Sequence, residues 1–503
     1  MLLSLVAWYI SYTSGLVTIY NDAMSHLNIS RMVIDNLEPG FAQLGGVWLP
    51  LTHILPLPLI WNDWAWHSGF AGSFFSMAAY VISVGAIYKT IFLLTKKSLA
   101  AIVGSLVFAC NLNMLYLQTT PMTEPIYIGI FSLSMFFFTL YLTKKRNTKY
   151  LLILGMLGFL QVLTRYDGWF VVVFQAMLIA VNELFVMRKS IAESVGRVFL
   201  FAIPVSFGIG LWLLWNALIF GNPLFFAYGE YSAHSQQLIF ENRGELATRG
   251  DIITSIITYG QSLLHNIGVF VALLAVVSIV IFLRMKKVVL PISKRVVFLA
   301  FLFSPILFNI LALFLGFSVI LTPPFSFGQN LLSLEPWFNI RYGLLALPLV
   351  AISIGFFASW KKLALAVAFL VIMVQAYYTY TYGIASLVDG TIGSSSYYAV
   401  DMTEAVKTRV KPEDKVLMSL YSFNQVAFKS GIDLNQVVHE GVSRQWSQAQ
   451  KNPENYADWV VMINEVSDPL YSSLVVNNKE TFLKSYKLVY TGNNSSIYQR
   501  KNN

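Results

Sequence analysis

Long apolar stretches separated by polar loops dominate the first 380 residues. A helix needs about 20 mostly apolar residues to cross the hydrocarbon core of a bilayer. About eleven stretches approach this length, and they lie near residues 2–20, 68–94, 98–117, 125–143, 150–164, 168–187, 198–220, 267–284, 296–316, 341–360 and 363–381. The pattern predicts an α-helical polytopic membrane protein, with the first stretch kept as a span rather than cleaved as a signal peptide.

The loops between these stretches fall into two sets. One set is short and basic, for example at 144–146 and 286–287, whereas the other is mostly acidic and includes the longest loops. By the positive-inside rule the basic set is cytoplasmic. This predicts outer loops at 21–67, 118–124, 221–266 and 317–340, a cytoplasmic N-terminus and an extracytoplasmic C-terminus, in the cell membrane.

The pattern changes after about residue 382. Short apolar runs at 416–418, 437–438, 459–463 and 488–490 alternate with helix-compatible segments, and Met402, Val406 and Val410 repeat at helical spacing. This alternation predicts a small extracytoplasmic α/β domain over residues 383–503. A polar stretch at 389–396 is interpreted as the linker to a transmembrane domain over residues 1–382.

Composition and charge narrow the class further. Hydrophobic residues make up 56% of the chain and charged residues 12%, which excludes a soluble enzyme, a disordered chain and a fibrous repeat. Residues 1–380 carry 22 Lys and Arg against 13 Asp and Glu, and the remainder carries 12 of each, so the net charge of +9 belongs to the membrane part. We therefore expect no nucleic-acid partner. The single cysteine, Cys110, excludes a disulfide framework.

The first outer loop carries candidate chemistry. Asp22 and His26 are four residues apart and share a helical face, where a carboxylate can act as a general base or, with a histidine, hold a metal. Asp22 can also simply cap the helix. The helix expected over 21–37 is predicted to lie in the membrane interface. The apolar side of this helix is formed by Met24, Leu27, Ile34 and Leu37. Further along the loop, Trp48, Trp61, Trp64 and Trp66 are expected to form an aromatic belt at the membrane surface.

Charged residues at the outer ends of other spans are further candidates. Glu124, next to Pro125, either interacts with the helix dipole or faces a polar cavity. Arg165 either neutralises Asp167 at a short turn or joins a site. Arg341 opens a span on the side that basic residues avoid, where its planar fork can bind phosphate or snorkel to lipid head groups.

Asp22, His26, Glu124, Arg165 and Arg341 all map to the same predicted membrane face. There, a carboxylate can deprotonate a hydroxyl acceptor while an arginine stabilises a leaving phosphate.

The sequence resembles the GT-C superfamily of membrane glycosyltransferases, which use polyprenyl-phosphate sugars, and within it the protein mannosyltransferase and lipid-sugar transferase group. The resemblance rests on the acids Asp22 and Glu124, the Arg341-Tyr342 motif and the outer C-terminal domain. It implies inverting transfer to a glycan, lipid or protein acceptor.

The resemblance also implies roles. Asp22 would be the base or a metal-binding carboxylate, and Glu124 would support the same centre. Arg341 and Arg165 would bind the donor phosphate. His26, His53 and Tyr342 would give further support.

Two departures and two alternatives remain. The first loop has a single Asp22, with no Asp-Glu pair and no Asp-x-Asp, so no cofactor is certain and a divalent metal held by Asp22, His26 and Glu124 is left open. One alternative is a lipid or sugar transporter or flippase, which commonly carries ionisable residues mid-span, where none is predicted here. The other is a non-catalytic assembly protein with a GT-C-like fold.

Overall fold

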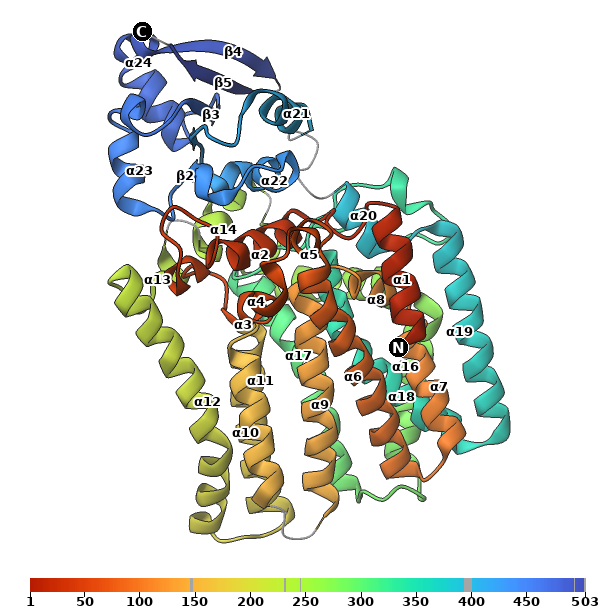
Figure 1. The fold of residues 1–503 in the computed structure, drawn as a ribbon. Helices are drawn as coiled ribbons and strands as arrows, with labels where there is room; N and C mark the ends of the chain where they lie inside the picture. Colours follow the sequence, from red (N-terminus) through yellow and green to blue (C-terminus); the bar gives the residue numbers. More distant parts are fainter. Residues whose placement is uncertain (145–147, 230–231, 245, 393–399, 493, 502–503) are drawn as a thin grey trace. The chain divides into compact units, whose positions relative to one another are not determined.

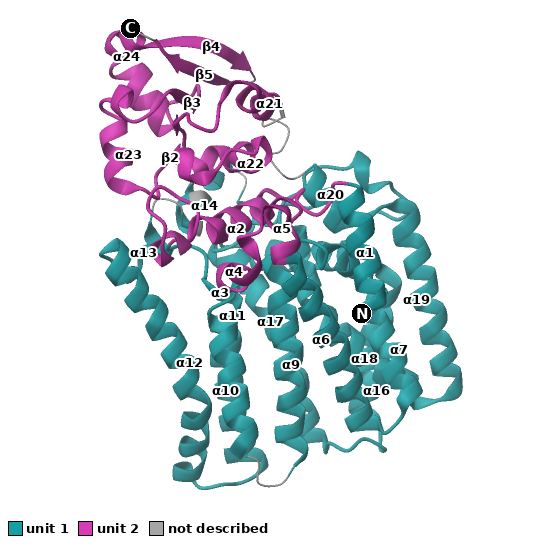
Figure 2. Ribbon diagram, viewed as in Figure 1, with its two compact units in different colours: residues 1–14, 46–52, 73–393 teal, residues 15–45, 53–72, 394–503 magenta. Residues whose placement is uncertain are grey.

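The computed structural model describes residues 1–144, 148–229, 232–244, 246–392, 400–492 and 494–501. The chain divides into two compact units, coloured in Figure 2. Unit 1 comprises residues 1–14, 46–52 and 73–393, and unit 2 comprises 15–45, 53–72 and 394–503. Unit 2 thus combines segments from both ends of the sequence. The predicted boundary near residue 382 stays a prediction, and each unit is described below by itself.

Unit 1 is largely helical, and its long helices run alongside one another in Figure 1. Neighbouring pairs include α10 with α12, α7 with α18 and α11 with α17. The helices are α1 (Leu2–Thr13), α6 (Phe70–Thr95), α7 (Ser98–Ala109), α8 (Leu112–Leu117), α9 (Thr123–Thr143), α10 (Thr148–Val162), α11 (Tyr166–Val181), α12 (Ile191–Phe220), α13 (Phe225–Tyr228), α14 (Ala233–Asn242), α15 (Ile252–Ile267), α16 (Val269–Arg284), α17 (Ile292–Leu315), α18 (Leu347–Trp360), α19 (Lys362–Tyr382) and α20 (Ala385–Thr391). Short 3₁₀ helices include η3 (Leu331–Ser333) and η4 (Ile340–Ala346).

Seven helical segments among the described residues are long and apolar enough to cross a membrane. They span Phe70–Thr95, Thr123–Thr143, Tyr166–Val186, Ile191–Phe220, Ile292–Leu315, Ile340–Trp360 and Lys362–Thr391. The bent pair of α15 and α16 makes an eighth if it counts as one span. These helices confirm the predicted helical membrane architecture, while the orientation of the chain stays a prediction. Lys145 and Arg146, two of the basic loop residues, lie outside the described residues.

The predicted number of about eleven spans is not confirmed, because three of the predicted spans contain short helices. Helices α1, α7 and α10 have 12, 12 and 15 residues. At about 1.5 Å per residue, 12 residues cover about 18 Å, well short of a hydrocarbon core of about 30 Å. The stretch 98–117 is interrupted because Asn111 accepts a hydrogen bond from the Met114 N–H and so caps a new helix, α8.

A sharp bend separates α15 from α16. The chain bends by 108° between the two helices, at Gly268, whose φ is +90°. A Cβ at this position would lie 1.9 Å from the Gln375 side chain, so only glycine fits the bend. At its other end, α15 is capped by the Asp251 carboxylate, which accepts hydrogen bonds from the N–H groups of Ile253 and Thr254. Much of the segment predicted as loop 221–266 is therefore helical.

Unit 2 contains a five-stranded mixed sheet of order β2-β1-β3-β5-β4. The strands are β1 (Val416–Leu417), β2 (Val437–Val438), β3 (Trp459–Ile463), β4 (Tyr486–Gly492) and β5 (Ser495–Arg500). Strand β1 pairs in parallel with β2 and β3, whereas β5 pairs antiparallel with β3 and β4. All four predicted apolar runs contribute to strands, and the small α/β fold is confirmed. Strand β5 was not predicted, because its sequence is mostly polar.

Both faces of this sheet are buried. Alternate strand residues enter two separate hydrophobic clusters, as the two-residue period of a strand requires. Val416, Val437, Trp459 and Val461 belong to one cluster, and Leu417, Val438, Val460 and Met462 belong to the other. The first face packs with α21 (Val400–Arg409) and α22 (Leu420–Ser430), and the second with α23 (Ser443–Ala449) and α24 (Lys479–Ser485). Burial on both faces explains why the run at 459–463 is continuously apolar.

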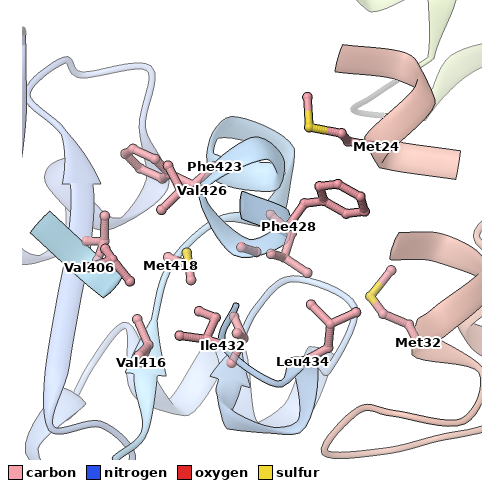
Figure 3. Packing of buried hydrophobic residues seen from close by; sticks show 14 of the residues in the cluster. Met24, Met32, Val406, Val416, Met418, Phe423, Val426, Phe428, Ile432 and Leu434 are labelled. Carbon is pink, nitrogen blue, oxygen red and sulfur yellow. The ribbon is translucent and has the colours of Figure 1, made fainter. Parts of the chain in front are cut away.

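The N-terminal segments of unit 2 complete the cover of the first face. They form α2 (Asn21–Met32), α4 (Leu57–Ile60) and α5 (Asp63–His67). Met24 and Leu27 are fully buried in the same cluster as Phe428, and Met24, Met32 and Phe428 are drawn together in Figure 3. The helix ends at residue 32, before Ile34. Met24 and Leu27 on the apolar side of α2 therefore pack against protein rather than against lipid, while the position of the helix at the membrane interface stays a prediction.

The tryptophans of this region divide in the same way. Trp61 and Trp64 are exposed, as an aromatic belt requires, whereas Trp66 is only 1% exposed and belongs to the first cluster. The prediction of a belt residue is wrong for Trp66. Its indole ring lies 4.7 Å from the Arg31 guanidinium and contacts Phe428 edge-on.

We expect Leu27→Ala to destabilise unit 2 by roughly 2–5 kcal/mol, because it leaves a cavity in a packed core. Ile34→Ala, a matched change at a side chain that is 48% exposed, is expected to cost less than about 0.5 kcal/mol. Hydrogen exchange of the sheet amides in purified protein measures both effects. Equal protection in the two variants would contradict the packing of α2 against the sheet.

Candidate active site

Glu124 lies at the start of a long helix in unit 1. It is the second residue of α9, which begins after Met122. Pro125 follows without loss of a helical hydrogen bond, because N–H groups of the first turn have no partner within the helix. The Glu124 side chain is 1% exposed. The positive end of the helix dipole favours a carboxylate here, but its burial requires further partners.

Two arginines from distant parts of the sequence supply these partners. Arg165 Nη1 lies 2.9 Å and Arg341 Nε 3.1 Å from the same oxygen, Glu124 Oε1. Arg165 precedes α11 in extended backbone, and Arg341 lies in η4, just before α18. The ends of three helical segments thus bring one carboxylate and two guanidinium groups together.

Two further carboxylates complete the arrangement. Asp167 Oδ2 accepts a hydrogen bond from Arg165 Nε at 3.2 Å, and Asp389 Oδ2 accepts one from Arg341 Nη1 at 3.3 Å. Arg165 Nη1 also donates to Thr123 Oγ1. The Tyr342 ring centre lies 4.7 Å from the Arg165 guanidinium carbon and 5.4 Å from that of Arg341. We call these seven residues the Glu124 cluster: Thr123, Glu124, Arg165, Asp167, Arg341, Tyr342 and Asp389.

The Glu124 cluster brings together four residues singled out from the sequence. The predicted pairing of Arg165 with Asp167 forms, and Arg165 also reaches Glu124. Arg341 is 5% exposed and bonds to carboxylates of its own unit, which does not match a side chain that snorkels to lipid head groups. Tyr342, expected only as support, stacks on both arginines.

Asp389 was missed by the sequence analysis. It was assigned to a linker because the residues after it are polar and small. It lies in α20 and is 2% exposed, so the linker prediction is wrong for 389–391, while 393–396 lie outside the described residues. A signal was present, because Asp389 is the first acid after the last predicted span, on the side that holds Arg341.

The charges of the Glu124 cluster do not balance. Three carboxylates face two guanidinium groups, a formal charge of −1. Within the described residues, Glu124 Oε2 is buried with no hydrogen-bond partner, and the same holds for the Tyr127 hydroxyl one turn further along α9. Buried polar atoms of this kind are normally satisfied by water or by a ligand. The arrangement can therefore accept a hydrogen bond at Glu124 Oε2.

The remaining candidates belong to unit 2. Asp22 is the second residue of α2, in its first turn, and is half-buried. His26 Nδ1 and His53 Nε2 form a hydrogen bond of 2.8 Å between buried rings. His53, expected only as support for the site, is therefore a hydrogen-bonded residue. A common site for Asp22 and the Glu124 cluster stays a prediction.

Burial lowers the pKa of two histidines in unit 2. The pKa of His53 is well below its ordinary value, first because of burial and second because of the nearby His26. Burial alone lowers the pKa of His439 from 6.5 to about 4. The neutral His439 ring donates from Nε2 to Asn36 Oδ1 and accepts from the Gly441 N–H at Nδ1. A proton on Nδ1 would break the second bond.

Metal binding finds no support in the described part of the chain. Within it, no group of three or more His, Cys, Asp or Glu side chains could hold a metal ion.

No protein-family model and no curated protein matches the sequence. Solved structures do match. ArnT from Cupriavidus metallidurans bound to undecaprenyl phosphate is 12% identical, with a TM-score of 0.59 over 98% of this chain and 96% of that one. The apo state of ArnT gives a TM-score of 0.52 at the same identity and coverage.

The apo oligosaccharyltransferase from Archaeoglobus fulgidus is 10% identical, with a TM-score of 0.50 over 97% of this chain and 72% of that one. ArnT and the oligosaccharyltransferase are both GT-C proteins. The chain has the GT-C fold. At 10–12% identity the likeness concerns the fold alone, and the reaction has to be argued from the residues.

We expect unit 2 to lose stability as the pH falls below 6.5. His439 has a lowered pKa in the folded state, so the unfolded chain takes up the proton first. Its contribution is complete above pH 6.5 and is lost between pH 6.5 and about 4; the difference of 2.5 pKa units corresponds to about 3 kcal/mol. The lowered pKa of His53 changes the stability of unit 2 with pH in the same direction. Hydrogen exchange of the sheet amides across this range measures the loss.

His439→Gln is the test variant, because glutamine can also donate and accept but does not titrate. It should flatten the pH dependence. His234→Gln is the control, since His234 belongs to unit 1. An unchanged slope in His439→Gln would refute the assignment.

Proposed function

We propose that this protein is a membrane glycosyltransferase that moves a sugar from a polyprenyl-phosphate donor to a hydroxyl acceptor with inversion. The observation that carries the proposal is the convergence of Arg165 and Arg341 on one buried oxygen of Glu124. The GT-C fold adds support, because ArnT, which shares it, has been solved with undecaprenyl phosphate bound. Sugar, acceptor and membrane are left open.

The proposed reaction is a single displacement. The acceptor oxygen forms a bond to the anomeric carbon from the face opposite the phosphate, and the bond between that carbon and the phosphate oxygen breaks. The acceptor proton passes to a carboxylate, for which Asp22 is the candidate. The electron pair leaves with the polyprenyl phosphate, whose growing negative charge an arginine stabilises.

Within the Glu124 cluster we assign different roles to the two arginines. Arg165 donates to Thr123, Glu124 and Asp167, so its nitrogens are occupied and it holds Glu124 in place. Arg341 bonds to Asp389 at 3.3 Å, a longer contact than the 3.1 Å to Glu124. We infer that the donor phosphate displaces Asp389 from Arg341, which keeps Glu124 as its second partner. Arg165 then acts on the phosphate mainly through its charge.

Glu124 then has two tasks. Oε1 fixes both arginines, and Oε2 accepts a hydrogen bond from the substrate or from a bound water. Because two guanidinium groups stabilise its ionised form, Glu124 is a weaker candidate for the base than Asp22. Tyr342 orients both arginines by stacking. The His26–His53 pair would support the turn of α2 next to Asp22.

We expect Asp22→Asn to abolish transfer without unfolding the protein, because an amide cannot accept the acceptor proton. Purified, reconstituted protein would be given a panel of labelled polyprenyl-phosphate sugars with a crude acceptor extract. Release of polyprenyl phosphate would be followed with and without EDTA. Glu413→Gln, at an exposed acid of the same unit, is the control.

Three outcomes of this experiment are informative. Release that depends on Asp22 supports the proposal, and a loss of release in EDTA would show that a metal takes part. No release from any donor by folded wild-type protein would favour the transporter or assembly readings.

A second prediction concerns the competition for Arg341. Arg341→Ala should raise the donor KM by about 10-fold or more, since a charge-assisted contact contributes roughly 1.5–3 kcal/mol. Asp389→Asn should lower the donor KM instead, because it removes the competing carboxylate and brings the cluster charge from −1 to zero. Steady-state kinetics over a donor titration measures both. A donor KM that rises in Asp389→Asn would contradict the proposed displacement.

A further inference from the structure

A directed chain of hydrogen bonds in unit 2 ends next to Asp22. It begins at Trp66, whose indole Nε1 donates to Asn28 Oδ1 at 3.2 Å. Asn28 Nδ2 donates to Asn424 Oδ1 at 2.6 Å, and Asn424 Nδ2 donates to Ser25 Oγ at 2.8 Å. Ser25 Oγ in turn donates to the backbone carbonyl of Asn21 at 3.1 Å. Asn21 is the first residue of α2 and the direct neighbour of Asp22.

The direction of this chain is fixed by its first member. An indole nitrogen can only donate, so Asn28 must present its oxygen to Trp66 and its NH₂ group to Asn424. Asn424 then presents its oxygen to Asn28 and its NH₂ group to Ser25. The Ser25 hydroxyl accepts that bond and gives its own proton to the Asn21 carbonyl. Each group therefore has one role, and the bonds support one orientation of the first turn of α2.

Asn424 is the member that joins the two ends of the sequence. It is 6% exposed and lies in α22, directly after a kink at Phe423, whose φ of −116° and ψ of 25° are not helical. Its backbone carbonyl also accepts a bond from Asn28 Nδ2 at 3.2 Å. Asn28 is 1% exposed, so the pair is sealed from water. Burial makes an unmatched amide costly, which favours this arrangement over alternatives.

The other end of α2 is held separately. Arg31 forms ion pairs with Asp35 and Asp63 and donates to the carbonyls of Ile60 and Trp61. Loss of Asn424 would therefore release the first turn while the last turn stays anchored. A change confined to the first turn alters the placement of Asp22 more than the packing of unit 2.

We propose that Asn424 is a positioning residue for transfer: through Ser25 it holds the first turn of α2, and with it Asp22, in the orientation that the reaction requires. The C-terminal segment thereby supports the reaction without touching the substrate. This inference rests on the proposed function, in which Asp22 is the base. Misplacement of a reacting group by about 1 Å can cost as much as 100-fold in rate.

The test compares Asn424→Ala with Gln436→Ala. Gln436 is the matched control, because it is also a buried amide of unit 2, 4% exposed, but its side chain bonds only to the backbone of 411, 414 and 433. Asn424→Ala should lower kcat by about 10-fold or more, with the donor KM changed less than about 2-fold. Hydrogen exchange in the first turn of α2 should quicken. Gln436→Ala should leave kcat and α2 exchange unchanged.

A second variant covers the case in which Asn424→Ala does not fold. Ser25→Ala keeps the pair of Asn28 and Asn424 and removes only the last two bonds, at a half-buried side chain. It should also lower kcat, and the double variant should be no slower than Asn424→Ala alone, since Ser25 and Asn424 act in series.

Unchanged kcat in Ser25→Ala and Asn424→Ala, in an enzyme whose transfer depends on Asp22, would overturn the inference and leave the proposed function standing. An equal fall of kcat in Gln436→Ala would also overturn it. Folded wild-type protein without transfer activity would overturn both.

Discussion

The sharing of the Glu124 carboxylate between two arginines is the interaction on which the polar end of unit 1 depends. A buried carboxylate without partners costs several kcal/mol, and each buried guanidinium carries a similar cost. Arg165 and Arg341 therefore fix Glu124, and Asp167 and Asp389 in turn fix the arginines. These bonds tie α9, the start of α11, η4 and α20 to one another. None of the four segments can move far without breaking one of these ion pairs.

Unit 2 depends on a different constraint, the need to cover both faces of a sheet. Its central strands are apolar on each side, so neither face tolerates water. The C-terminal segment covers one face with α23 and α24. The other face needs Met24 and Leu27 of α2 in addition to α21 and α22. The C-terminal segment thus shares a hydrophobic core with the N-terminal segment that carries Asp22.

Local sequence patterns correctly predicted the secondary structure of segments whose conformation depends on neighbouring residues. The apolar run at 459–463 is a strand, as its short length between polar segments indicates, and Met402 and Val406 lie in a helix, as their spacing indicates. Glu124 stood out as an acid at the end of a span, where it either interacts with the helix dipole or faces a polar cavity, and Arg341 because basic residues avoid the outer side. The sequence could not reveal which partner each charge finds. Asp389 lies 48 residues from Arg341 and sits among small polar residues, as a linker residue would.

The features that the sequence could not predict depend on distant partners or on a single side chain, and local patterns do not record either. An apolar helix side has the same sequence whether it meets lipid or a protein core, so α2 was predicted to lie in the interface. The bond between Asn28 and Asn424 spans 396 residues, and no local pattern records it. An apolar stretch of 20 residues also does not reveal a helix break, which at Asn111 comes from one side-chain cap.

The two units use polar groups in opposite ways, and the difference matches the roles proposed for them. Coulomb attraction depends on distance rather than on a fixed direction, so in the proposed exchange Arg341 gives up one anion, the Asp389 carboxylate, and takes another, the donor phosphate. Amide hydrogen bonds are directional, and a chain that starts from a donor-only indole has a single direction. A group that must meet a changing charge therefore belongs in an ion-pair cluster. A base that must meet one proton in one direction is better held by oriented amides, which is the role we propose for Asn424 and Ser25 toward Asp22.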